Sequence, residues 1–351
     1  MPPSDIVGGF GGGPVRQPRL NVLVNGMPLV GATEASVTST AFFGSDWFTV
    51  RAALSGDAAM WVGLPRILVD VQMALSPLGG FVSLIQGFAD RVSIDPIAGV
   101  LAIEGRDRSA DLIEARTQET FANRTASEIA TILAARHGLG ASVQPTATPV
   151  GRYWELEHDR LTLNAAGRAT TEWDLLVLLA RREGFDLRVT GSTLHFRPPD
   201  TLTPPPVLAA APTASGPPDF AAVRLNRALG FAGDISVTVK SWHSRAGAGT
   251  VQTARTQRGS ANVQSYVFVV PNLTPDAALL LAQRRLAEIA GHEMLLRAEM
   301  PGELALAPRG FFQLVGTGTA FDCVWRIDEV ERHMSMREGF SQVVRATAGS
   351  V

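Results

Sequence analysis

The stretch GVLAIEGRDRSADLIEA at residues 99–115 holds the carboxylates that most resemble a catalytic acid–base pair. Asp107 lies between two arginines, and Asp111 and Glu114 follow it. A general acid–base pair needs two carboxylates held across a cleft with pKa values shifted apart. These three instead follow the end of an expected strand and a helical turn, with arginines beside them. The sequence therefore favours local ion pairing and turn capping over catalysis.

A second acidic group lies in YWELEHDRL and comprises Glu155, Glu157, His158 and Asp159. It is the nearest thing to a hydrolase site in the chain, but it shows no recognisable zinc, Cys/His or paired-acid spacing. GHEMLL begins like the zinc-protease helix H-E-x-x-H, yet its fifth position is Leu296. No G-x-S-x-G elbow occurs either. We expect no catalytic residue, no metal and no cofactor.

The remaining reactive side chains are isolated. Five histidines stand singly: His137, His158, His195, His243 and His333. His137 ends an expected helix, where a cation complements the helix dipole. The sole lysine, Lys240, lies in a strand pattern without a phosphate-binding loop. The sole cysteine, Cys323, excludes an internal disulfide, and its β-like surroundings predict a buried structural role.

Composition describes a globular chain of 351 residues with 46% hydrophobic and 18% charged residues. The net charge of −2 argues against a protein whose main task is to grip a phosphate backbone. No apolar run is long enough to span a bilayer. The N-terminus lacks the basic start and apolar core of a signal peptide, so cytoplasmic synthesis is expected.

The order of elements predicts a mainly β chain with an α+β insertion. Residues 1–18 read as a flexible Gly/Pro-rich arm, and 19–118 alternate strand-like runs with turn residues as a first β-barrel would. Residues 119–198 carry two capped helices and a hairpin about a Gly-Ser turn, an α+β domain. A proline-rich linker or strap, 199–219, precedes a second β-barrel at 220–351 with a helix at about 275–290.

The two β regions resemble one another. GGFVSLIQG at 79–87 matches RGFFQLVGT at 309–317, and each match is followed by a strand, a turn with glycine and a final strand. The match predicts a duplicated barrel in which Gly80 corresponds to Gly310 and Leu84 to Leu314.

The run TASEIATILAARHGL, the segment TEWDLLVLLARREGFDLRVTGSTLHF, the stretch DISVTVKSWHSRAGAG and the closing MPGELALAPRGFFQLVGTG…WRIDEVERHMSMREGFSQVVRATA resemble the baseplate hub proteins of phage tails, the late control protein D family. The resemblance covers roughly residues 20–348 and rests on the order of loose motifs.

This resemblance implies two tail-tube-like barrels per chain and a homotrimer forming a pseudo-six-fold ring. Such a ring would adapt a six-fold tail tube to a three-fold spike and leave a channel for genome or tape-measure passage. Its partners would be the spike, tube or distal tail proteins and other baseplate proteins, without sequence-specific nucleic acid binding or stable membrane insertion. Its place would be the tail of a virion or tail-like particle, assembled in the host cytoplasm.

Hubs of phages, gene transfer agents, tailocins, contractile injection systems and type VI secretion share this pattern. The competing hypothesis is an enzyme, a tail-associated cell-wall hydrolase carried by residues 119–198. A DNA-binding portal or adaptor is a third class, and it would need a basic stripe that the composition does not supply.

Overall fold

The computed structural model describes residues 16–55, 58–77, 79–147, 149–150, 169–199, 204–212, 216–243, 248–259, 262–271 and 273–349. The chain divides into two compact units. Unit 1 comprises Met1–Thr203, Pro301–Arg309 and Glu329–Gln342, and unit 2 comprises Pro204–Met300, Gly310–Asp328 and Val343–Val351. Strands account for 47% of the structure and helices for 18%, which confirms the mainly β fold with an α+β insertion.

The first β region, in unit 1, is an antiparallel sheet in the order β2-β1-β5-β6-β7-β4-β3. Its strands are β1 (Arg19–Val24), β2 (Met27–Pro28), β3 (Ala32–Thr40), β4 (Trp47–Ala53), β5 (Leu68–Ala74), β6 (Val82–Asp95) and β7 (Val100–Asp107), with the short helix α1 (Ala58–Gly63) between β4 and β5. Alternate residues point to one side and form a core that includes Phe48, Val50, Val69 and Ile103.

The sequence reads FVSLIQG at 81–87 and DRVSID at 90–95 as two separate strands, but Val82–Asp95 form the single 14-residue strand β6. A register shift between Ala89 and Arg91 bends it, so that one strand continues where the sequence suggests a break. Two glycines allow neighbouring strands to approach closely. A Cβ on Gly87 would lie 1.8 Å from the Arg106 carbonyl oxygen, and a Cβ on Gly105 would lie 2.2 Å from the Phe88 carbonyl oxygen.

The α+β region of unit 1 has its own apolar core. Its elements are α2 (Ser109–Glu114), α3 (Ala126–Arg136), β8 (Gly140–Val143), α4 (Glu172–Glu183), β9 (Asp186–Thr190) and β10 (Thr193–Arg197). Capping boxes begin both long helices as expected, Thr125 with Glu128 and Thr171 with Asp174. The buried side chains of Leu133, Leu176 and Phe196 lie in this core.

The second β region has the strand order β11-β17-β18-β19-β16-β12. Its strands are β11 (Val207–Ala209), β12 (Ala222–Arg227), β16 (Met294–Pro301), β17 (Phe311–Val315), β18 (Val324–Ser335) and β19 (Gly339–Ala348). The first part of β18 belongs to unit 2 and pairs with β17, and its second part belongs to unit 1 and pairs with β3.

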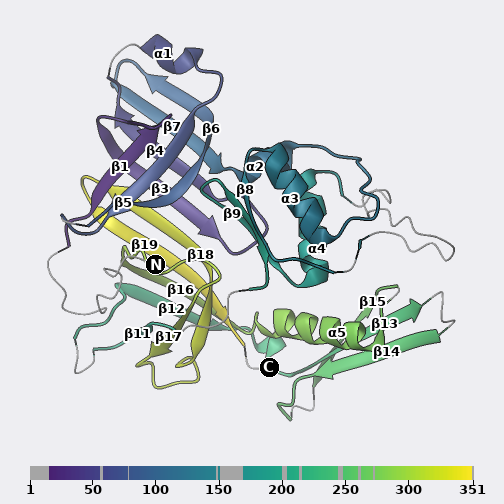
Figure 1. The fold of residues 1–351 in the computed structure, drawn as a ribbon. Helices are drawn as coiled ribbons and strands as arrows, with labels where there is room; N and C mark the ends of the chain where they lie inside the picture. The colour runs from purple at the N-terminus through teal and green to yellow at the C-terminus, as the bar shows by residue number, and fades with distance from the viewer. Residues whose placement is uncertain are drawn as a thin grey trace. The chain divides into compact units, whose positions relative to one another are not determined.

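An insert between β12 and β16 forms a separate three-stranded sheet, β13 (Asp234–His243), β14 (Ala248–Arg255) and β15 (Val263–Val269). Helix α5 (Pro275–Ala290) has the expected bounds, is capped by Thr274 and lies along one face of this sheet, as Figure 1 shows. The strands that the sequence assigned to a second barrel therefore include a small layer with its own core. A 3-10 turn, η3 (Leu229–Phe231), precedes it.

The proline-rich segment 199–219 contributes an edge strand. Within it, β11 pairs in parallel with β17, and Leu208 is fully buried. An extended chain next to prolines suits an edge position, because proline cannot donate to a second neighbouring strand. Among the described residues, no helix is long and apolar enough to cross a membrane.

Candidate functional site

The acidic stretch at 107–114 is divided between structural roles. The Asp111 carboxylate lies 2.5 Å from the Arg66 guanidinium, and Glu114 pairs with Arg106. These two contacts agree with the expected local ion pairing. Arg106 also makes a two-pronged ion pair with Asp90, at 2.7 and 2.8 Å, and these hydrogen bonds raise its pKa above the usual value.

Asp107 caps the following turn, as expected, but it is also buried beside a second acid. Its side chain is 7% exposed and accepts hydrogen bonds from the Ser109 hydroxyl at 2.5 Å and the Ser109 amide at 3.2 Å. Burial, reinforced by the charge of Asp46, raises the pKa of Asp107 to about 7. Burial also raises the pKa of Asp46, while a hydrogen bond from the Thr40 amide opposes that shift.

Two arginines from the second half of the chain complete this buried cluster within unit 1. Arg309 donates to the Thr40 carbonyl at 3.2 Å and to the Leu187 carbonyl at 3.3 Å. Arg332 donates to the carbonyls of Glu303 and Leu306, and burial lowers its pKa to about 10. Both arginines attract the charge on Asp46. The hydrogen bonds of this cluster join protein groups to one another, which fits a structural role.

The other reactive side chains have local roles. His137 ends α3, as expected, and its Nε2 lies 2.6 Å from a carboxylate oxygen of Glu172, which also pairs with Arg136. No group of three His, Cys, Asp or Glu able to hold a metal occurs among the described residues. The acidic group Glu155, Glu157, His158 and Asp159 lies outside the described residues.

Cys323 differs from expectation, and the described tryptophans divide between core and surface. Cys323 lies just before β18 and is half-buried, not part of the strand interior, and burial raises the pKa of its thiol. Trp61, Trp173 and Trp325 are buried, and the Trp173 indole donates to the Phe43 carbonyl at 3.0 Å. Trp47 and Trp242 are 45% and 59% exposed, because both point away from their sheet's core.

The tertiary structure brings polar side chains together on one side of the sheet in unit 1, which we call the polar face. It is the outward side of the strands β6, β7, β4 and β3 and of the second part of β18. Strand alternation and the pairing registers place these side chains on it: Asp90, Arg91, Ser93, Glu104, Arg106, Thr49, Arg51, Glu34, Ser36, Glu329, Glu331 and His333. Carboxylates outnumber guanidinium groups along it, so the surface is hydrophilic without being basic.

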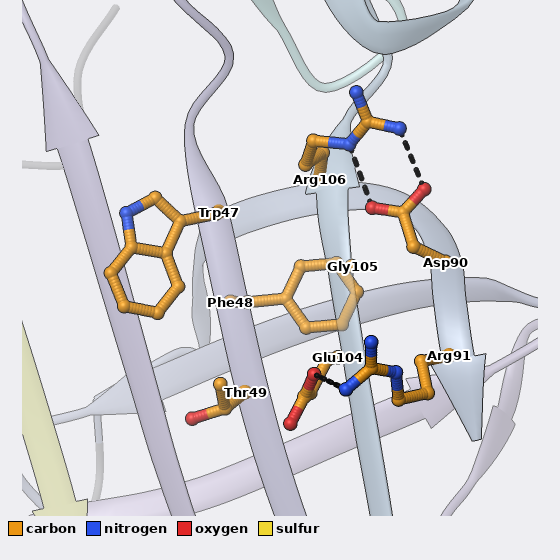
Figure 2. Close-up of a pocket in the computed structure, with 8 residues that line it drawn as sticks. All are labelled: Trp47, Phe48, Thr49, Asp90, Arg91, Glu104, Gly105 and Arg106. Carbon is orange, nitrogen blue, oxygen red and sulfur yellow. Dashed lines mark hydrogen bonds and ion pairs between the residues drawn. The ribbon is translucent and has the colours of Figure 1, made fainter.

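A surface hollow of about 380 Å³ lies on the polar face beside Trp47. Figure 2 shows Arg106 directed at Asp90 and Arg91 directed at Glu104, with Thr49 between the strands. The Arg91–Glu104 ion pair is 3.7 Å long, and both side chains are more than half exposed. The cations and anions of the hollow already pair with each other, so it carries no unsatisfied charge that would bind a small ion.

The two β regions repeat one strand order. The strands of each region can be numbered from one to six in chain order, leaving out β2 and the insert sheet β13–β15. Both β1-β5-β6-β7-β4-β3 and β11-β17-β18-β19-β16-β12 then have the order 1-4-5-6-3-2 across the sheet. One difference is that β1 pairs with β5 antiparallel whereas β11 pairs with β17 parallel. The expected match of Leu84 with Leu314 is wrong, because Leu84 lies on the fifth strand of its region and Leu314 on the fourth.

The turns between the last two strands agree as well. Asp95 accepts a hydrogen bond from the Ala98 amide at 2.9 Å, and Ser335 accepts one from the Glu338 amide at 2.9 Å. Each turn ends in a glycine with positive φ, Gly99 at 64° and Gly339 at 78°. The expected turn with glycine before the final strand is therefore confirmed in both regions, whereas the match of Leu84 with Leu314 is not.

No protein-family profile matches the chain, and no curated protein matches it. Solved structures do. A tail protein from Neisseria meningitidis MC58 superposes with a TM-score of 0.70 at 15% identity, covering 94% of this chain and 96% of the other. The 43 kDa tail protein of prophage MuSo2 from Shewanella oneidensis gives a TM-score of 0.67 at 16% identity, with 94% and 98% covered.

A third similar structure is an Escherichia coli component of the type VI secretion system that exhibits structural similarity to the T4 bacteriophage tail proteins gp27 and gp5. Its TM-score is 0.57 at 10% identity, with 94% of this chain and 77% of the other covered. Identities this low carry the fold and not the activity. The chain therefore has the fold of phage tail proteins, which type VI secretion components share.

Proposed function

We propose that this protein is the structural baseplate hub of a phage-like tail, of the late control protein D type. Three copies form a ring, and each copy contributes two β regions, so that six similar regions surround one axis. The repeated strand order is the observation that supports this most strongly, because a duplicated region lets a three-fold assembly present a six-fold surface.

The hub joins partners of different symmetry. One side of the ring meets the six-fold tail tube or distal tail proteins, and the other meets a three-fold spike. Other baseplate proteins bind at the periphery. The ring acts in the tail of a virion or tail-like particle and is assembled in the cytoplasm of the host.

The polar face lines the channel of the ring. A polymer passing such a channel must not adhere, and basic surfaces bind nucleic acid through phosphate neutralisation. The excess of carboxylates over guanidinium groups on the polar face supports free passage of genome or of a tape-measure protein.

Assembly is tested by light scattering over a wide concentration range, and by electron microscopy of the protein mixed with the spike and tube proteins encoded beside it. We expect a three-fold complex, either alone or formed upon addition of the spike. Obligate ring contacts commonly bury about 2,000 Å² or more, and such contacts form once concentration or a template suffices. A protein that stays monomeric with both partners present would overturn the proposal.

A peptidoglycan zymogram tests the enzyme class separately. A hub without hydrolase activity leaves no cleared zone, and Glu157→Gln changes nothing. Lysis that disappears in Glu157→Gln would replace the purely structural role by a tail-associated cell-wall hydrolase.

A further inference from the structure

Each β region has a strand edge whose partner decides how copies meet. In the first β region, β3 pairs along its outer edge with residues 329–335 of β18, so this edge is closed within the chain. In the second β region, the equivalent strand β12 pairs with β16 alone among the described strands. An edge strand left open exposes unpaired amide and carbonyl groups that readily accept another strand.

A matching open edge lies on β6. Strand β5 pairs with β6 only as far as Phe88, whereas β7 pairs with it as far as Asp95. Among the described strands, residues 90–95 thus have one neighbour, on the β7 side. By the repeated strand order and the shared turn geometry, this segment corresponds to residues 330–335 of β18, which bind β3.

Burial distinguishes the closed junction from the open edges. Where β3 meets β18, Val37 and Ala35 are 1% and 4% exposed. At the open edges, the inward-facing Val92 and Ile94 of β6 and Val223 and Leu225 of β12 are only half-buried. These apolar side chains lack the cover that their counterparts receive from the neighbouring strand.

We propose that β12 of one copy pairs antiparallel with residues 90–95 of β6 in a second copy. Matching the inward sides gives the register, with Leu225 opposite Val92, Val223 opposite Ile94, and therefore Arg224 opposite Ser93. This inference rests on the proposed function, since it names the contact through which copies of the hub close a ring.

Charge is compatible with the same pairing. β12 carries Arg224 and Arg227, and the β6 segment carries Asp90, Arg91 and Asp95. In its own sheet Arg224 stands directly opposite another cation, Arg297, an arrangement that disfavours pairing. In the proposed register Arg224 faces the uncharged Ser93, and its diagonal neighbours are Asp95 and Arg91, one of each charge.

Helix α1 covers the new junction. In the second β region, Pro301–Arg309 follows the third strand and leads to the fourth. This segment belongs to unit 1, as the closed junction does, and two of its backbone carbonyls accept hydrogen bonds from Arg332. The equivalent segment of the first β region carries α1, which contacts β6. Met60 and Val62 on α1 are 55% and 78% exposed, so α1 offers apolar surface to the neighbouring copy.

The test is a disulfide across the junction. In a Cys323→Ser background, Ser93→Cys and Arg224→Cys are introduced together and oxidised, and products are separated by size without reductant. Residues directly opposite in antiparallel strands lie about 4.5–5.5 Å apart at Cα, within disulfide range. We expect covalent dimers and covalent trimers that disappear upon reduction.

Two control pairs share the background. Ser36→Cys with His333→Cys spans the closed junction, where the two residues are register partners, and should form a bond without any change in size. Ser93→Cys with Val207→Cys joins β6 to the β11 edge and should form no covalent oligomer.

A matched pair of charge variants tests the contact without cysteines. Ser93→Arg should weaken association up to about five-fold per junction by facing Arg224, and Ser93→Glu should strengthen it.

The outcomes separate the contact from the function. A trimer in light scattering without the Ser93–Arg224 cross-link, while the closed-junction control is oxidised, would overturn the interface and leave the hub proposal standing. Cross-linked dimers that never close to trimers would support the edge pairing and overturn the three-fold ring. Equal cross-linking of the β11 control would show random collision and overturn the interface.

Discussion

Replacing Asp107 by asparagine should make unit 1 more stable at alkaline pH. Asparagine keeps the oxygen that accepts from Ser109 and removes the charge that burial and Asp46 disfavour. The substitution therefore leaves the local hydrogen bonds of the β7–α2 corner in place. Its effect reports on the buried acid pair alone.

The magnitude follows from the shift in pKa. The pKa of Asp107 rises from 3.8 to about 7, so between these pH values the folded chain holds a proton that the unfolded chain has lost. Stability then falls as pH rises through this window, and the loss is complete above about pH 7. At 1.36 kcal/mol per pKa unit the full effect is about 4 kcal/mol. Asp107→Asn should be about as stable as the wild type near pH 4 and up to about 4 kcal/mol more stable near pH 8.

Urea titrations followed by tryptophan fluorescence measure this difference, at about pH 4 and about pH 8 for both proteins. The control is Asp111→Asn, which removes a partly exposed ion pair with Arg66 and should change the free energy of unfolding by less than about 1 kcal/mol. An Asp107→Asn protein that loses stability between the two pH values as steeply as the wild type would refute the reasoning.

Three further predictions concern packing, capping and composition. Gly87→Ala should lower the free energy of unfolding by more than about 2 kcal/mol, because its Cβ would meet the Arg106 carbonyl at 1.8 Å, while Gly80→Ala, with no atom within 4 Å, should be nearly neutral in the same thermal melts. Thr171→Ala removes the cap of α4 and should lower the free energy of unfolding by about 1 kcal/mol, whereas Thr171→Ser keeps the capping hydroxyl and should retain most of that stability. Elemental analysis of purified protein should find no stoichiometric zinc, since the described residues hold no ligand cluster, and one zinc per chain would contradict this.

Local signals in the sequence predicted most of the elements correctly. The helix starts at Thr125, Thr171 and Thr274 follow from side chains that cap the next amides, a contact decided within three residues. The Gly191-Ser192 turn fixes its hairpin in the same way. Alternation of apolar residues, a property of consecutive positions, also located the strands of the first β region.

Strand pairing depended on distant parts of the chain. The sequence contained the strands of the small insert sheet but did not distinguish them from those of the second β region, since both alternate with the same period. The repeat was recognised through glycines, yet its strand correspondence changed once the ladder was known. Loops of different length change the spacing of equivalent strands along the sequence, but they do not change which strands pair in the sheet.

The sequence by itself determined the class of the protein: a mainly β chain with capped helices, balanced charge and isolated reactive residues. Only the tertiary structure decided that Asp107 is buried beside Asp46, that β18 closes the edge of β3, and that β12 and residues 90–95 of β6 have one neighbouring strand each among the described residues. The physical reason is that burial and strand pairing are properties of neighbours in space. Asp46 and Arg332 are far apart in sequence, and the electrostatic attraction between them arises only after folding brings them close together.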